Sequence, residues 1–341
     1  MRKFMIVLTF LGILAASVTL ATTSIVGAGS TFTYPIMSKW TNQYFKLHPD
    51  VEINYQSIGS GGGIKQVTEG TVDFGATDGP LDDKQLAEFK QKRGSNVLHF
   101  PTVLGGVVPI YNVPGVNGNL KFTPAALAGI YLGHITKWND SELTKANPGI
   151  SLPPHDIVVM HRSEGSGTTY CWADYLSKVS PEWKNNVGVG TAISWPVGLG
   201  GKGSEGVTGL VKQTPYSIGY VELIYALQNK LGYGDVQNLS GKFIHADLAS
   251  VTAAAAGAAK SMPSDFRVSI TNAPGPTVYP ISTYTWLLVP QKISDPIKKK
   301  IVVGFVHWVL TEGQKDAEPL AYAPLPKSVQ AKELKQLATV Q

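Results

Sequence analysis

The chain has 341 residues, of which 43% are hydrophobic and 16% charged, and its formal net charge is +5. That length and composition suffice for one large core or two moderate ones. The 36 glycines and 22 prolines show no period, which excludes a collagen-like or wholly disordered chain. The positive charge is too small to predict a nucleic-acid-binding protein.

The N-terminus, MRKFMIVLTFLGILAASVTLA, has a basic start, an apolar stretch and then small residues. This layout predicts a secretory signal peptide over residues 1–24, cleaved after Ala21 or a few residues to either side. An uncleaved membrane anchor is the alternative, but the apolar run is short and ends in small residues. Loss of Arg2 and Lys3 would change the net charge from +5 to +3, because residues 1–21 contain no acid.

Short apolar runs then alternate with amphipathic segments. The predicted strands cover 25–29, 51–59, 72–77 and 156–162, and a strand-rich stretch broken by glycine and proline covers 97–114. The predicted helices cover 34–49, 63–72, 168–179 and a segment within 294–318. Recurring strand–loop–helix units predict an α/β fold with largely parallel sheets.

Four glycine-rich turns stand out: GAGSTFTYP (27–35), SIGSGGGIKQ (57–66), DFGATDGPLDD (73–83) and RSEGSGTTY (162–170). Each pairs small residues with a hydroxyl near a predicted helix N-terminus, where unpaired N–H groups and the helix dipole favour anions. Glycine lets the backbone approach a tetrahedral oxyanion closely. One such turn is usually a simple helix cap, but four in one chain predict an anion site.

The fourth turn adds Arg162, whose planar fork suits an oxyanion. The alternative is a flexible loop with a helix cap, and an aspartate such as Asp78 is by itself an ordinary turn residue. His155 and His161 lack metal-ligand spacing and are interpreted as structural. Cys171, the single cysteine, is interpreted as a small buried hydrophobe rather than a reactive thiol.

Motifs for other chemistry are absent or weak. The sequence has no GxxxxGK[ST] phosphate loop and no GxSxG nucleophile elbow. GLGGKG (198–203) matches the dinucleotide-binding pattern, but no strand–helix–strand context is evident, and it is interpreted as a loop.

Longer motifs carry a family resemblance. They are GAGSTFTYP, YQSIGSGGGIKQV, TVDFGATDGPL, FPTVLGGVVPIYN, IYLGHITKWND, HRSEGSGTTY, EWKNNVGVGTAISWPVGLGGKGSEGV and SIGYVE. Together they closely resemble the periplasmic phosphate-binding proteins of high-affinity phosphate ABC transporters. The similarity runs in the same order over nearly the whole mature chain.

The resemblance implies a periplasmic-binding-protein fold, in which two lobes, each a sheet flanked by helices, are linked by a hinge with the ligand cleft between them. The expected lobes are 25–111 plus 279–341, and 112–278. The implied phosphate-binding residues are Ser30, Thr31, Phe32, Ser60, Asp78, Arg162, Ser166, Gly167 and Thr168. Glu164 stands where the family typically has an aspartate that orients the arginine. Glutamate is one methylene longer, so the geometry of the contact between Arg162 and Glu164 is expected to differ from that in the family.

The implied function is binding of inorganic phosphate in the periplasm and its delivery to the membrane permease subunits of an ABC transporter. A monomer is expected, with no catalytic residues, metal, cofactor or nucleic-acid partner. The first alternative is an exported phosphatase, which would need a metal cluster or an activated nucleophile, and neither is visible in the sequence. The second is an adhesion or binding protein that uses the same fold without transport.

Overall fold

A computed structural model describes residues 22–116, 118–260 and 262–341 of the chain. The predicted signal peptide lies outside the described residues except at its last three positions. Thr23 and Ser24 begin the first strand there, paired with Val51 and Glu52. No helix within the described residues combines the length and the apolar character that a bilayer crossing needs.

The structure contains the following elements. The strands are β1 (Thr23–Gly29), β2 (Val51–Ser57), β3 (Phe74–Thr77), β4 (Val97–Asn112), β5 (Lys121–Phe122), β6 (Val158–Arg162), β7 (Leu199–Gly201), β8 (Ser217–Glu222), β9 (Gly232–Tyr233), β10 (Asp235–Gln237), β11 (Phe243–Ile244) and β12 (Ser282–Pro290). The helices are α1 (Tyr34–Leu47), α2 (Ser60–Glu69), α3 (Asp83–Arg93), α4 (Pro124–Leu132), α5 (Ser141–Ala146), α6 (Gly167–Val179), α7 (Pro181–Asn186), α8 (Gly203–Gln213), α9 (Leu223–Asn229), α10 (Leu248–Lys260), α11 (Pro296–Leu310) and α12 (Lys327–Leu337), with 3₁₀ turns at Glu312–Asp316 and Glu318–Leu320.

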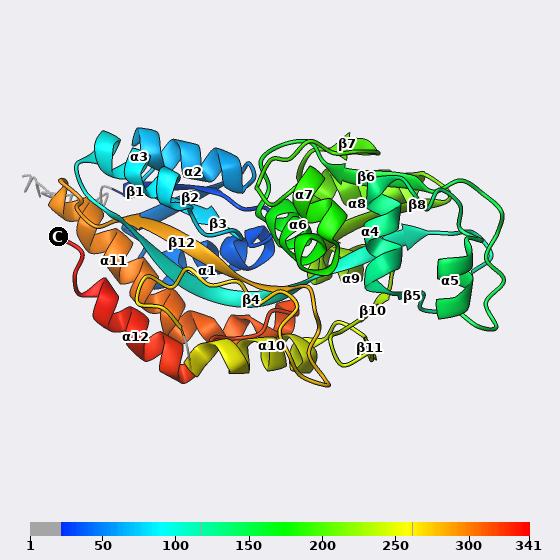
Figure 1. The fold of residues 1–341 in the computed structure, drawn as a ribbon. Coiled ribbons are helices and arrows are strands. Elements are labelled where there is room, and N and C mark those ends of the chain that lie inside the picture. The colour runs from blue at the N-terminus through cyan, green and yellow to red at the C-terminus, as the bar shows by residue number, and fades with distance from the viewer. Residues whose placement is uncertain (1–21, 117, 261) are drawn as a thin grey trace, which may run out of the picture.

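One long strand connects two lobes (Figure 1). The main sheet has the order β2-β1-β3-β12-β4-β8-β6-β7, with β9 also paired to β4. Within β4, residues 97–106 pair with β12 in the first lobe, and residues 107–112 pair with β8 in the second. The backbone of β4 therefore runs through both lobes.

The predicted strand breaks in 97–114 are wrong, because β4 runs unbroken over 16 residues. Its sequence is almost continuously apolar, as expected for a strand buried on both faces. Pro101, which cannot donate to the ladder, lies where the pairing with β12 shifts register between Thr285 and Trp286. The irregularity accommodates the proline without ending the strand.

The expectation of largely parallel sheets is also wrong at the centre. β1 pairs in parallel with β2 and β3, and β6 with β7 and β8. The central pairings, β3 with β12, β12 with β4 and β4 with β8, are antiparallel. The strand–loop–helix signal is thus correct for the outer part of each lobe, where the glycine-rich turns lie.

Helices cover the sheet in both lobes (Figure 1). α1, α2, α3, α11 and α12 surround the first lobe, and α4, α6, α8 and α9 surround the second. α10 packs on β4, as α12 does, although the expected lobe boundaries assign α10 to the second lobe. Those boundaries, at 111/112 and 278/279, remain a prediction.

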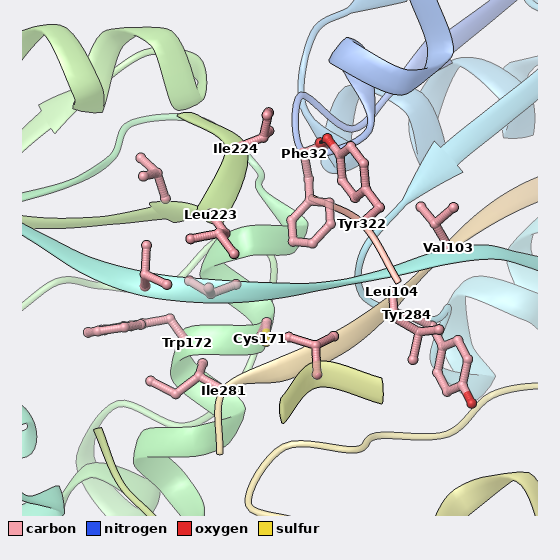
Figure 2. Close-up of a cluster of buried hydrophobic side chains, with 14 of the residues drawn as sticks. Phe32, Val103, Leu104, Cys171, Trp172, Leu223, Ile224, Ile281, Tyr284 and Tyr322 are labelled. Atoms are coloured by element: carbon pink, nitrogen blue, oxygen red, sulfur yellow. Dashed lines mark hydrogen bonds between the residues drawn. The ribbon is translucent and has the colours of Figure 1, made fainter. Parts of the chain in front are cut away.

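Aromatic and aliphatic side chains gather around β4 where the lobes meet (Figure 2). Phe32, Cys171, Trp172 and Tyr322 are all at most 1% exposed and belong to one continuous core. Burial raises the pKa of the Cys171 thiol well above its usual value, so the side chain stays a neutral thiol. The interpretation of this cysteine as a small buried hydrophobe is confirmed.

Gly63 lets α2 lie directly on β1. A Cβ at this position would fall 2.4 Å from the Ala28 carbonyl oxygen and 2.5 Å from Gly29 Cα. Both atoms are backbone, so relief would require the helix to move away from the strand. We predict that Gly63→Ala lowers the free energy of unfolding by about 1–3 kcal/mol, the usual cost of overpacking.

The matched control is Gly257→Ala in α10, where an added Cβ meets nothing within 4 Å. Alanine there should raise stability by up to about 1 kcal/mol through helix propensity alone. Denaturant unfolding of both variants without ligand measures the contrast. Equal stability of Gly63→Ala and the parent would contradict the packing argument.

Candidate functional site

Three of the glycine-rich turns lie in the first lobe and the fourth in the second. The first joins β1 to α1, the second joins β2 to α2, and the third follows β3. The fourth joins β6 to α6. Direct contacts bring them together: Gly61 N–H donates across the lobes to the Gly165 carbonyl at 2.9 Å.

Asp78 lies at the centre of this meeting point and is 1% exposed. The Ser30 hydroxyl donates to its Oδ1 at 2.5 Å, and the Ser60 hydroxyl donates to its Oδ2 at 3.4 Å. Burial raises the pKa of Asp78 to about 6, although the hydroxyls and the charge of Arg162 oppose that rise. Asp78 is therefore an acceptor above about pH 6 and carries a proton below it.

Gly167 explains how closely the lobes approach. A Cβ there would fall 2.5 Å from both the backbone nitrogen and Oδ2 of Asp78, and 2.6 Å from Ser60 Oγ. The first turn of α6 thus points at the carboxylate of the opposite lobe. A side chain at this position would hold the two lobes apart.

Arg162, at the end of β6, is held by Glu164. Arg162 Nε donates to Glu164 Oε1 at 2.9 Å, and Nη2 forms an ion pair with the same oxygen. The Gly203 N–H donates to that oxygen too, at 3.0 Å. Glu164 therefore meets the Nε–Nη2 side of the guanidinium through one oxygen, while Oε2 has no partner within the described residues.

The remaining guanidinium nitrogen of Arg162, Nη1, faces two hydroxyl groups of the site. Its distances to Thr168 Oγ1 and Ser204 Oγ are 3.3 and 3.4 Å. These contacts are long for hydrogen bonds to a guanidinium, so Nη1 remains able to turn to a stronger acceptor. The arginine side chain is only 1% exposed.

Several backbone N–H groups at the turns donate to no acceptor in the part of the chain that the structure describes. They belong to Thr31, Phe32, Ser60, Gly167 and Thr168. Ser60 and Gly167 begin α2 and α6, where N–H groups have no intrahelical partner. Buried donors without acceptors are rare, so this cluster favours an anionic ligand.

Ser30 and Ser166, two of the predicted site residues, use their backbone N–H groups in hydrogen bonds within the protein. Ser30 N–H donates to the Ala76 carbonyl at 3.0 Å, so Ser30 acts through its hydroxyl on Asp78. Ser166 N–H donates to the Thr191 carbonyl at 2.7 Å, and its Oγ caps α6 by accepting from Thr169 N–H at 3.1 Å. The Ser166 hydroxyl proton is still available to a ligand.

Phe32 is fully buried and contributes only its backbone. Its carbonyl accepts from the Tyr322 hydroxyl at 2.6 Å. Its ring packs against Gly105 of β4, where a Cβ would meet the ring at 2.6 Å (Figure 2 shows Phe32 and Tyr322 beside the strand). The ring anchors the first turn, and the N–H faces the site.

The sequence analysis missed Ser204. Its hydroxyl lies 2.9 Å from Thr31 Oγ1 in the opposite lobe and is buried. The segment GLGGKG, interpreted as a loop, contains β7 and leads directly into α8. The strand-to-helix pattern that marked the other four turns is present here as well, and it could have identified this fifth turn.

Within the described residues, no group of three or more histidine, cysteine, aspartate or glutamate side chains is placed to hold a metal ion. His161 stacks on Trp195 with ring centroids 4.7 Å apart, and His155 stacks on Tyr216 at 3.8 Å. Both histidines therefore pack as aromatic neighbours.

Comparisons with known proteins agree with this architecture. A family model described as a PBP superfamily domain matches residues 16–312. A solved structure of a high affinity periplasmic phosphate-binding protein (PfluDING) bound with phosphate has a TM-score of 0.72 at 20% identity, covering 91% of this chain and 93% of that one. A phosphate ABC transporter substrate-binding protein from Clostridium perfringens has a TM-score of 0.64 at 20% identity, covering 89% and 100%. The expected two-lobed α/β fold is confirmed.

Curated relatives are much more similar in sequence. The phosphate-binding protein PstS of Xylella fastidiosa is 46% identical over 306 residues, covering 89% of this chain and 82% of the relative. That of Pasteurella multocida is 44% identical over 307 residues, covering 90% and 87%. That of Methanocaldococcus jannaschii is 39% identical over 322 residues, covering 88% and 82%. The chain therefore belongs to the PBP superfamily and, within it, to the family of PstS phosphate-binding proteins.

Proposed function

We propose that this protein binds inorganic phosphate between its two lobes and delivers it to the permease subunits of a phosphate ABC transporter. The observation that carries the proposal is the buried set of N–H donors and Arg162 around one carboxylate, Asp78. The names of the relatives support the same ligand. Export by a cleaved signal peptide, a periplasmic location and a monomeric state belong to the proposal.

The charges of the site favour a ligand that carries a proton over a fully deprotonated anion. Arg162 contributes +1, while Glu164 and ionised Asp78 contribute −1 each, so the three side chains sum to −1. Net charge therefore does not attract the anion, and binding depends on directed donors. Asp78 can accept a hydrogen bond from a P–OH group, whereas a fully deprotonated anion such as sulfate would present only lone pairs to it.

We propose that the nine residues expected from the resemblance form the site, with Glu164 orienting Arg162. Thr31, Phe32, Ser60, Gly167 and Thr168 would donate through backbone N–H, and Arg162 through its guanidinium. Asp78 would accept the ligand proton and reject sulfate. The names of the relatives favour a binding role rather than catalysis.

Equilibrium binding tests the proposal directly. Purified protein is incubated with radiolabelled phosphate, with sulfate and arsenate as competitors, and separately with a phosphate ester. Retention of phosphate without hydrolysis of the ester supports a binding protein. Turnover of the ester would support the phosphatase alternative, and absence of phosphate binding would refute the proposal.

Removing the arginine should weaken binding. We predict that Arg162→Ala lowers phosphate affinity at least about tenfold, because a charge-assisted hydrogen bond contributes about 1.5–3 kcal/mol. Arg162→Lys should also weaken binding, since lysine keeps the charge but loses the planar fork. Calorimetric titration measures the affinities, and thermal unfolding without phosphate checks that the variants are folded.

Arg93→Ala is the control for loss of one positive charge, because Arg93 lies in the last turn of α3, away from the site. Its affinity should match that of the parent. An unchanged dissociation constant in Arg162→Ala would remove this arginine from the site.

Asparagine in place of Asp78 should change selectivity more than phosphate affinity. The amide oxygen can still accept the ligand proton, while the amide NH₂ can donate and the negative charge is gone. We predict a modest fall in phosphate affinity and the appearance of sulfate binding in Asp78→Asn. Titration of each anion at neutral pH and fixed salt measures both.

Asp82→Asn is the matched control in the same turn, since Asp82 caps α3 through Gln85 N–H and asparagine caps equally well. It should bind phosphate and exclude sulfate as the parent does. If Asp78→Asn excludes sulfate as completely as this control, Asp78 does not determine selectivity.

The titration of Asp78 predicts a pH dependence of selectivity in the unmodified protein. Because burial raises its pKa to about 6, the carboxyl is ionised and repels sulfate at pH 7.5, and is protonated and able to donate near pH 5. Sulfate binding should therefore appear as the pH falls through about 6. Sulfate is the suitable probe because its own charge stays constant over this range.

Sulfate titrations at several pH values measure the effect, with Asp78→Asn as the control, since the asparagine variant should bind sulfate without a step near pH 6. A parent protein that excludes sulfate equally at pH 5 and pH 7.5 would contradict the assignment.

A further inference from the structure

Thr31, in the first anion-binding turn, is held from the opposite lobe by two residues. Its Oγ1 lies 2.9 Å from Ser204 Oγ and 3.4 Å from the Ser204 nitrogen, which donates to it. Its carbonyl accepts from the Tyr225 hydroxyl at 2.6 Å. We propose that Ser204 and Tyr225 are positioning residues that form, with Thr31, an inter-lobe latch and set the lifetime of the closed, phosphate-bound state. The inference rests on the proposed function.

The latch is well placed to act on the ligand through Thr31. Ser204 is the second residue of α8 and Tyr225 lies in α9, both in the second lobe, and both are at most 5% exposed. They occupy the side-chain oxygen and the carbonyl of Thr31, while its N–H makes no bond within the described residues. Holding Thr31 by its acceptors thus leaves its N–H directed at an anion.

Each latch residue also has a partner in its own lobe. The Tyr225 hydroxyl lies 3.1 Å from Glu205 Oε1, and Ser204 Oγ lies 3.4 Å from Arg162 Nη1. A tyrosine hydroxyl has one proton, so Thr31 and Glu205 compete for it. When the lobes separate, Tyr225 can donate to Glu205, and no buried donor is left without an acceptor. The latch therefore favours closure only modestly and remains reversible.

The dissociation rate of phosphate is the direct readout. Protein loaded with radiolabelled phosphate is chased with excess unlabelled phosphate, and retained label is followed in time. Ser204→Ala and Tyr225→Phe should each release phosphate about 2- to 10-fold faster, as expected for loss of one net hydrogen bond. Association should change less than twofold, because the latch forms after the anion enters. Ser204→Thr, which retains the hydroxyl, should restore slow release.

Two controls match the chemistry of these changes away from Thr31. Ser217→Ala removes a buried hydroxyl bonded to the Val211 and Thr214 carbonyls, and Tyr233→Phe removes a hydroxyl near the Ala246 carbonyl. Both should release phosphate at the parental rate. If Ser204→Ala and Tyr225→Phe behave like these controls while the parent binds phosphate, the latch is refuted and the proposed function stands. Failure of the parent to bind phosphate would instead refute the proposed function.

A double-mutant cycle separates the latch from general loss of stability. If Ser204 acts through Thr31 Oγ1, Ser204→Ala should have little further effect on the dissociation rate in a Thr31→Val background. Independent, additive effects of the two substitutions would overturn the assignment of Ser204 as a residue that acts through Thr31.

Discussion

Burial of polar groups without partners is the constraint from which the properties of the site follow. Where the lobes meet, backbone N–H groups from two helix N-termini and the first turn donate to no acceptor among the residues that the structure describes. The one carboxylate among them, Asp78, is already engaged by the Ser30 and Ser60 hydroxyls. An excess of buried donors is costly until an acceptor arrives. A tetrahedral oxyanion supplies several acceptor atoms at once, which explains why this geometry favours such a ligand.

The long strand β4 makes the meeting of the lobes possible. It passes from β12 to β8 at Gly106 and Val107, so both lobes share one backbone at this point. Phe32 packs against the same region of β4, and Tyr322 holds the Phe32 carbonyl. The first glycine-rich turn is thus anchored close to the place where β4 crosses between the lobes. Rotation of one lobe about such a crossover would move the donors of α6 relative to Asp78, as in hinge closure.

Local signals in the sequence predicted the parts of this site that belong to single turns. Glycines with a hydroxyl at a helix start identified the turns at Ser30, Ser60 and Ser166, because capping chemistry is local in sequence. Arg162 was identified from the turn beside it. The roles of individual residues came from the family resemblance. The contacts between the two lobes, such as that of Thr31 with Ser204, could not be predicted from local patterns, because they depend on how the lobes are placed relative to each other.

The errors have physical reasons too. Glycine and proline within 97–114 predicted breaks, but a strand buried on both faces gains enough from packing to tolerate a proline at an irregular pairing. β12 comes late in the chain and inserts between β3 and β4, antiparallel to both. No local sequence pattern indicates where such a late strand will pair. Ser204 was missed because GLGGKG was judged without its neighbours β6 and α8.

Glu164 links these parts. Glu164 Oε1 accepts from Arg162 and also from Gly203 N–H, the first residue of α8. One oxygen thus fixes the arginine and the start of the helix that carries Ser204, which in turn contacts Thr31 of the other lobe. With Nε and Nη2 held by Glu164, Arg162 Nη1 is directed at Thr168 and Ser204. Arg162 and the inter-lobe contact are therefore positioned by the same carboxylate, and a change in one would be transmitted to the other through a path only a few bonds long.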